Sequence, residues 1–150
     1  MNEVVKYRYL LGIDGDVHKS GVCLLDRKEK SILLLTTMTF PKLLDYFLEL
    51  KEKHGKELRV SIEAGWLNKS NWHRISSKSS NYNAKIGERT GANFEVGKKL
   101  FEMCEHYGID AILVKPTRKK LDKFEFFWHT GYNKRNNQEE RDSCMLVYGY

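Results

Sequence analysis

Three short apolar segments, joined by two polar turns, begin the chain and restrict what it can fold into. They are Tyr7–Asp14, Gly21–Asp26 and Ser31–Thr37. Each has the length of a strand, and the turns Gly15–Ser20 and Arg27–Lys30 separate them. Strands joined by such short turns are antiparallel neighbours, because a parallel pair needs a much longer crossover. The sequence therefore predicts an antiparallel meander.

The rest of the chain alternates helix-like with strand-like segments. Pro41 opens a helix whose apolar residues recur at helical spacing as far as Gly55, and Leu58–Glu63 is a fourth strand. A strand reached through a helix is most simply parallel to an earlier strand. The segments that follow are a long helix over Ala84–Tyr107, a fifth strand over Ala111–Val114 and a last helix from Asn136 or Asn137 to about Tyr148. The predicted order is β-β-β-α-β-α-β-α, an α/β fold.

Two further features concern the long helix and the segment before it. The polar segment Gly65–Asn83 predicts a long surface loop. Within the helix, Gly87, Gly91 and Gly97 each cost about 1 kcal/mol of helix propensity relative to alanine. Such a cost predicts that the sheet or a ligand backbone comes close to the helix at these glycines.

Length and composition limit the class of protein. With 150 residues, 41% hydrophobic and 31% charged, residues 1–150 are expected to form a single globular domain. There is no apolar run of about 18 residues, so no membrane span is expected, and residues 1–6 do not resemble a signal peptide. The three cysteines, Cys23, Cys104 and Cys144, form no CxxC motif and are expected to be small buried side chains. A cytoplasmic location is the resulting prediction.

Basic residues concentrate in two segments, although the net charge is only +6. Residues 68–90 carry a net +4 and residues 115–135 a net +5. Such clustering indicates a polyanionic partner, with a solvated surface as the alternative. The side chains expected to contact nucleic acid are Lys69, Arg74, Lys78, Lys85, Arg89, Lys115, Arg118, Lys119 and Lys120, together with Trp66 and Trp72. The aromatic run 124–128 is expected to pack on the sheet edge, with a dimer surface or stacking on opened bases as alternatives.

Four carboxylates fall at positions that the predicted fold brings together. Asp14 ends the first strand and Glu63 the fourth, so their side chains are neighbours if these strands are parallel. Glu139 and Asp142 are three residues apart in the last helix and project from one face. Taken singly, each acid can simply end a strand or complement a helix dipole. Together they indicate a site for Mg²⁺ or Mn²⁺, with two ions acting in phosphodiester cleavage.

Several motifs, in order along the chain, resemble those of RuvC-type nucleases of the RNase H-like superfamily, especially phage-type members. The motifs are Leu11-Gly12-Ile13-Asp14 followed by Ser20–Asp26, then Val60-Ser61-Ile62-Glu63, Lys85–Ala92 and Asn137–Leu146. The resemblance implies a five-stranded mixed sheet of order 3-2-1-4-5 flanked by helices. It also implies a homodimer that resolves Holliday junctions or other branched DNA in the presence of Mg²⁺. Asp14, Glu63 and Asp142 fall on the acidic positions of the family, and Glu139 falls on the fourth, more variable one.

The sequence departs from the family in the loop after Asp14, and other functions stay open. Residues 15–19 lack the usual Pro-Gly pair, and Asp16 there can be a metal ligand or merely turn the chain. His18 can contact a phosphate or have no role. The alternatives are a nuclease acting on RNA or RNA–DNA hybrids and a non-catalytic nucleic-acid-binding module. An actin-like or sugar-kinase-like ATPase fragment is less expected, because the chain lacks a second Asp-x-Gly phosphate motif and a second lobe.

Overall fold

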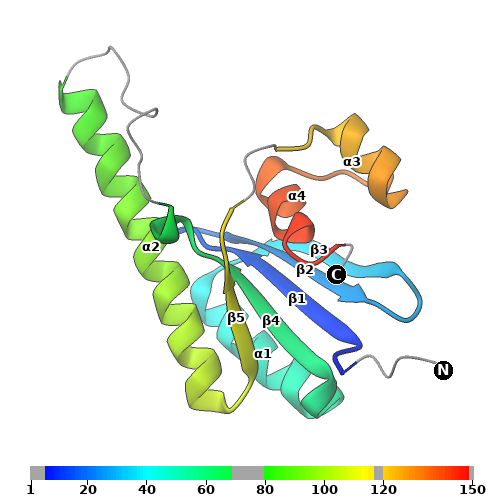
Figure 1. Ribbon diagram of the computed structural model, residues 1–150. Coiled ribbons are helices and arrows are strands. Elements are labelled where there is room, and N and C mark those ends of the chain that lie inside the picture. The colour runs from blue at the N-terminus through cyan, green and yellow to red at the C-terminus, as the bar shows by residue number, and fades with distance from the viewer. Residues whose placement is uncertain (1–5, 69–79, 117–119, 149–150) are drawn as a thin grey trace.

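A five-stranded mixed sheet forms the centre of the molecule (Figure 1). In the computed structural model, the structure describes residues 6–68, 80–116 and 120–148. The strands are β1 (Tyr9–Asp14), β2 (Ser20–Asp26), β3 (Ser31–Met38), β4 (Leu58–Glu63) and β5 (Asp110–Val114). Their order in the sheet is β3-β2-β1-β4-β5, which confirms the predicted order.

Strand direction divides the sheet into two halves that meet at β1. The pairs β1–β2 and β2–β3 are antiparallel, as expected for the predicted meander. The pairs β1–β4 and β4–β5 are parallel, and the last registered pair between β1 and β4 is Ile13 with Ile62. The carboxyl ends of β1 and β4 therefore lie side by side.

Helices cover both faces of the sheet, because alternate side chains of each strand point to opposite faces. Leu11 of β1 belongs to a core shared with α1 (Phe40–His54) and α2 (Ser80–Tyr107). Its neighbour Leu10 belongs to a second core, shared with α3 (Lys123–Thr130) and α4 (Gln138–Met145). Short 3₁₀ turns, η1 (Gly55–Glu57) and η2 (Gly65–Leu67), flank β4. None of the described helices is long and apolar enough to span a membrane.

The long helix α2 begins at Ser80, four residues before the predicted start, and ends at Tyr107 as expected. On the face of the helix that packs on the sheet, Leu100 and Cys104 are fully buried. Of the three α2 glycines, only Gly97 meets a close neighbour among the described residues, with the Trp66 ring 3.0 Å from a hypothetical Cβ. Cβ atoms at Gly87 and Gly91 would meet nothing within 4 Å among the described residues, so the sheet does not approach the helix there, and the approach of a ligand stays a prediction.

The helix α3 was not predicted, and it changes the interpretation of the aromatic run 124–128. Asp122 caps its first turn, accepting hydrogen bonds from the backbone N–H groups of residues 124 and 125, and Gly131 ends it in a left-handed conformation (φ 72°). Only Phe126 of the run is buried against the sheet side. The expectation that the run packs on the sheet edge is therefore wrong for the exposed side chains Phe124, Phe127 and Trp128.

The last helix, α4, lies directly on the sheet because two glycines leave room for its backbone. A Cβ atom on Gly12 of β1 would lie 2.1 Å from the carbonyl oxygen of Ser143, and one on Gly21 of β2 would lie 2.2 Å from that of Glu139. The N-terminus of α4 is fixed by a capping box between Asn137 and Glu140. The helix ends at Met145 rather than near residue 148 as predicted, and residues 146–148 continue it as a turn.

The remaining local predictions have mixed outcomes. The strand β1 begins at Tyr9 rather than Tyr7. All three cysteines are buried and unpaired in disulfides, which confirms their predicted character. The expected loop 65–83 contains the short turn η2 and the start of α2, and its central part, residues 69–79, lies outside the described residues.

Candidate active site

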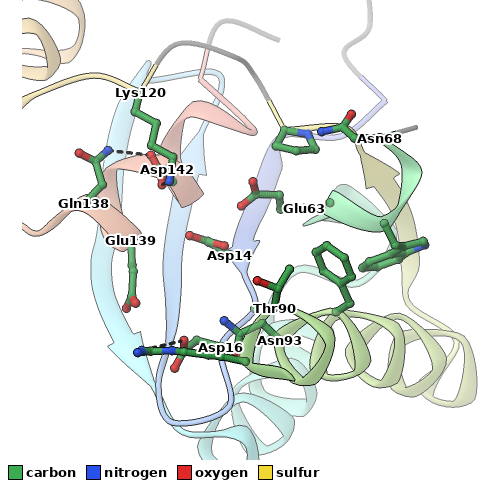
Figure 2. A pocket seen from close by; sticks show the side chains of 16 residues that line it. Asp14, Asp16, Glu63, Asn68, Thr90, Asn93, Lys120, Gln138, Glu139 and Asp142 are labelled. Carbon is green, nitrogen blue, oxygen red and sulfur yellow. Dashed lines mark hydrogen bonds and ion pairs between the residues drawn. The ribbon is translucent and has the colours of Figure 1, made fainter. Parts of the chain in front are cut away.

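A pocket of about 280 Å³ lies where the carboxyl ends of β1 and β4 face α2 and α4 (Figure 2). It contains five carboxylates: Asp14, Asp16, Glu63, Glu139 and Asp142. Two cationic side chains, Arg89 of α2 and Lys120, also line it. The structure thus brings together all four carboxylates that the sequence singled out, from two strands and one helix far apart in the chain.

The Asp14 carboxyl is the most perturbed acid of the pocket. Burial raises its pKa to about 9, and the neighbouring carboxyls of Glu63 and Asp142 act in the same direction. The cation of Lys120 opposes the shift only in part. Ionising all the carboxyls of the pocket is therefore unfavourable unless a cation lies among them.

Two side chains hold the Asp142 carboxylate at the edge of the pocket. The amide Nε2 of Gln138 donates to Oδ1 of Asp142 at 2.8 Å, and Nζ of Lys120 lies 3.4 Å from Oδ2. Gln138 was not predicted as a site residue. Its role could have been inferred from its position four residues before Asp142, because residues four apart in a helix lie next to each other on one face.

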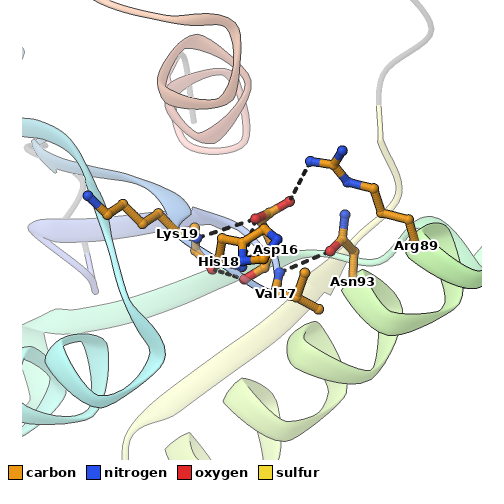
Figure 3. Close-up of polar contacts among 7 residues, drawn as sticks. Asp16, Val17, His18, Lys19, Arg89 and Asn93 are labelled. Carbon is orange, nitrogen blue, oxygen red and sulfur yellow. Dashed lines mark hydrogen bonds and ion pairs between the residues drawn. The ribbon is translucent and has the colours of Figure 1, made fainter.

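Asp16 turns the chain after β1 and also faces the pocket (Figure 3). Its Oδ2 accepts hydrogen bonds from the backbone N–H groups of His18 at 2.9 Å and Lys19 at 3.3 Å. Its Oδ1 lies 4.0 Å from the guanidinium of Arg89, which ties this turn to α2. Asn93 of α2, also missed by the sequence reasoning, strengthens the tie by accepting from the Val17 N–H at 3.0 Å.

On the α4 side of the pocket, Glu139 faces the Asp16 turn. Burial raises the pKa of Glu139 and the charge of Asp16 raises it further, while Arg89 lowers it. The exposed His18 side chain is not among the described residues that line the pocket. The charge of the pocket thus extends from Asp142 across to Asp16, with a cation at each end.

The predicted nucleic-acid contacts divide into three groups. Arg89, Lys120 and Trp66 line the pocket, whereas Lys85 and Lys115 are exposed outside it. The others, Lys69, Trp72, Arg74, Lys78, Arg118 and Lys119, lie outside the described residues.

The Trp66 ring is half-buried and packs on α2. Its centroid lies 6.0 Å from that of Phe94 in an edge-to-face arrangement, and Nζ of Lys98 lies 5.6 Å from it. A Cβ at position 97 would lie 3.0 Å from the ring, so Gly97 leaves room for Trp66 in its present position. This packing anchors the turn after β4 to α2, and a contact of Trp66 with DNA stays a prediction.

The donor set of the pocket suits a hard divalent cation, because it consists of carboxylate oxygens without cysteine or histidine. In the side-chain positions of the structure, no three histidine, cysteine, aspartate or glutamate residues of the described chain are grouped closely enough to hold a metal ion. Asp142 is instead engaged by Gln138 and Lys120. The pocket therefore fits such an ion in charge and ligand chemistry, while its carboxylates are not gathered around one point.

Comparison with known proteins bears on the fold. No family model matches the chain, and no curated protein sequence matches it. Among solved structures, T. thermophilus RuvC in complex with a Holliday junction substrate aligns with a TM-score of 0.56 at 11% identity. The alignment covers 95% of this chain and 91% of that one. The fold is RNase H-like. The order and directions of the strands agree with this conclusion.

Two further structures show weaker similarity. The yeast mitochondrial Holliday junction resolvase Ydc2 aligns with a TM-score of 0.41 at 12% identity, covering 96% of this chain and 78% of that one. The large terminase nuclease from thermophilic phage G20c gives 0.36 at 17% identity, covering 74% and 48%. Neither value is high enough to support an argument. The resemblance to resolvases thus holds at the level of the RNase H-like fold, and no sequence match supports the phage-type assignment.

Proposed function

We propose that the protein is a Mg²⁺- or Mn²⁺-dependent endonuclease that cuts Holliday junctions or other branched DNA by phosphodiester hydrolysis. The observation that carries the proposal is the convergence of Asp14, Glu63, Glu139 and Asp142 on one pocket. The pocket lies at the carboxyl ends of adjacent parallel strands, where open α/β sheets commonly bind ligands. The RNase H-like fold supports the same reading.

In this proposal Asp14, Glu63 and Asp142 hold the divalent cations, with Glu139 as a further ligand. Such ions, when bound, polarise a phosphate oxygen and lower the pKa of a water. Their charge would also offset the repulsion that raises the pKa of Asp14.

The other pocket residues position the site and its substrate. Lys120 and Arg89 are cations at the rim, and each can pair with a phosphate of the strand to be cut. Gln138 orients Asp142 through its hydrogen bond. Asp16 and Asn93 hold the turn after β1 against α2, so that one wall of the pocket keeps its shape.

We further propose a homodimer, because two matched nicks in a four-way junction are most simply made by two symmetric copies. The candidate contact surfaces are the aromatic run 124–128 and the long helix α2, and we favour the exposed N-terminal part of α2. Among the described residues none lies within 4 Å of a Cβ at Gly87 or Gly91 there, and small residues let two helices approach closely. Sedimentation with and without junction DNA tests this point, and a monomer in both conditions would favour an enzyme that makes single nicks.

A cleavage panel tests the proposed function. A four-way junction, a flap, an RNA–DNA hybrid and a plain duplex of equal length are incubated with Mg²⁺, Mn²⁺, Ca²⁺ or EDTA. We expect cleavage of the branched DNAs with Mg²⁺ or Mn²⁺ and binding with little cleavage in Ca²⁺, whose loose coordination orients water poorly. Preferred cutting of the hybrid would favour an RNase-type enzyme, and binding without cleavage in any metal would favour a non-catalytic module.

A further inference from the structure

The outer face of α3 carries three aromatic side chains that the described chain leaves exposed. Phe124 is 67% exposed, Phe127 47% and Trp128 84%. Their spacing of three and four residues places them on one side of the helix, opposite the fully buried Phe126. Exposed aromatic groupings of this kind mark contact surfaces, because leaving them in water forgoes the free energy of burial.

The surroundings of these rings are strongly cationic. Phe124 and Phe127 line a groove of about 590 Å³ whose charged members are Lys123, Lys134 and Arg135. No carboxylate occurs among the described residues that line it, and within the described chain none of the three cations forms an ion pair. This surface, which we call the α3 platform, is therefore both aromatic and positively charged.

The α3 platform is held in place by contacts on the opposite side of the helix. Phe126 packs edge-to-face on Tyr132, with ring centroids 6.1 Å apart. The Thr130 hydroxyl donates to the carbonyl of Phe126 at 2.8 Å and accepts from the N–H of Tyr132 at 3.1 Å. The exposed rings thus stand on a short helix fixed at both ends, and binding would cost little conformational entropy.

We infer that the α3 platform binds unpaired DNA, whose bases stack on the exposed rings while the phosphates face Lys134 and Arg135. Surfaces that bind single strands combine such aromatic rings with a cationic groove, because every base has a stacking face and every nucleotide carries a charge. A second copy of the chain is a poorer occupant. A symmetric contact would place the same three cations of both copies against each other.

This inference rests on the proposed function in one respect, since the unpaired strand would come from the branch point of the DNA that the enzyme cuts. In Figure 1, α4 lies between the long helix α2 and α3. The α3 platform would therefore be a second region of DNA contact, in addition to the carboxylate pocket. The helix α4 joins the two regions, because it supplies pocket residues and also packs with α3 on the second core.

Anisotropy of a labelled dT20 strand and of a 20-base-pair duplex, measured in EDTA, tests the inference without requiring metal or cleavage. We expect Trp128→Ala to weaken binding of the single strand about fivefold or more and to change duplex binding less than twofold. Trp128→Phe should retain most of the affinity. The control is Leu48→Ala, which removes a 46% exposed apolar side chain from α1 and should change neither.

Unchanged single-strand affinity in Trp128→Ala would overturn the inference even if the wild-type protein cuts branched DNA. Weakened single-strand binding together with no cleavage in any metal would instead reject the proposed function and leave the inference standing. If Trp128→Ala turns a dimer into a monomer in sedimentation, the platform contacts a second copy and the inference is wrong. The inference would also be contradicted if the wild type bound a U20 RNA as tightly as dT20, or more tightly, and Trp128→Ala lost this RNA binding, because the platform would then be an RNA site.

Discussion

Asp14 and Glu63 each directly follow the last registered residues of two parallel neighbours, Ile13 of β1 and Ile62 of β4. The sheet therefore fixes two carboxylates side by side at the carboxyl ends of these strands, and α4, which packs on the sheet, adds Asp142 to the same pocket. Burial and these like charges raise the pKa of Asp14 well above its usual range. Burial and repulsion at Asp14 thus lower the free energy of unfolding of the metal-free protein. This loss of stability can be measured and tests the proposed metal site.

Replacing Asp14 with asparagine should stabilise the metal-free protein. Between the unfolded pKa of about 3.9 and the raised folded value of about 9, the folded protein holds a proton that the unfolded chain releases. The free energy of unfolding therefore falls as pH rises through this window, and the loss is complete above it. Asparagine does not titrate, so Asp14→Asn should gain up to about 4 kcal/mol at pH 7 in EDTA, because pH 7 lies about three units above the unfolded pKa and each unit counts about 1.4 kcal/mol; a denaturant titration measures the gain.

The exposed Asp45 on α1 provides the control, since Asp45→Asn should change the stability little. The gain from Asp14→Asn should disappear near pH 3, where the carboxyl is neutral in both states. Millimolar Mg²⁺ should stabilise the wild type more than the variant, because a ligand of the native state raises the free energy of unfolding more when it binds more tightly. A variant that is no more stable in EDTA, and that gains as much from Mg²⁺, would show that these acids do not form one site.

The sheet and the main acids could be predicted because their signals are local. Turns of a few residues force β1, β2 and β3 to be antiparallel, and a helix before β4 makes β4 parallel to β1. The positions of Asp14 and Glu63 then follow from the ends of their strands. The strand order itself came from the family resemblance rather than from the turns alone.

Contacts between distant elements could not be predicted in the same way. The helix α3 was missed because its aromatic run has no apolar and polar alternation of helical period, although Asp122 and Gly131 were available as its caps. Asn93 became part of the site only through Val17, which lies far from it in the sequence, whereas the position of Gln138 four residues before Asp142 was a local signal. The partner of Gly97 was equally hidden, since the sequence does not show that Trp66 lies against it.

Gly12→Ala should destabilise the protein and disturb the candidate site together. The new Cβ would lie 2.1 Å from the carbonyl oxygen of Ser143, so α4 must shift off β1 and carry Asp142 with it. We expect a loss of about 1–3 kcal/mol in a denaturant titration, as is usual for overpacking. Lys42→Ala, at an exposed position of α1, is the control and should change stability by less than about 0.5 kcal/mol. Equal effects of the two substitutions would contradict the close seating of α4.

The salt dependence of DNA binding should identify the basic face of α2. Each phosphate contact that is lost reduces the slope of log affinity against log salt by about 0.9. Lys85→Ala with Arg89→Ala should therefore flatten the slope by roughly 1.8 for a branched DNA, if each contacts one phosphate. Lys53→Ala with Lys56→Ala removes two exposed lysines near the C-terminal end of α1 and should leave the slope unchanged. The same slope for both double variants would place the DNA elsewhere.

The most direct test of the account is the rate at which wild type and Asp14→Asn nick a four-way junction in Mg²⁺, with Asp45→Asn as control. In Mg²⁺ we expect nicking by the wild type and by Asp45→Asn, and none of the three should nick in EDTA. Asp14→Asn should lose on the order of a hundredfold in rate with Mg²⁺, because the carboxylate proposed to hold the metal is removed, and loss of a group that only orients a metal ligand already costs about 10- to 100-fold. Junction affinity in Ca²⁺ should stay within about twofold, because most of it comes from phosphate contacts outside the pocket. Undiminished nicking by Asp14→Asn, or nicking that persists in EDTA, would contradict the assignment of the carboxylate pocket as the catalytic site.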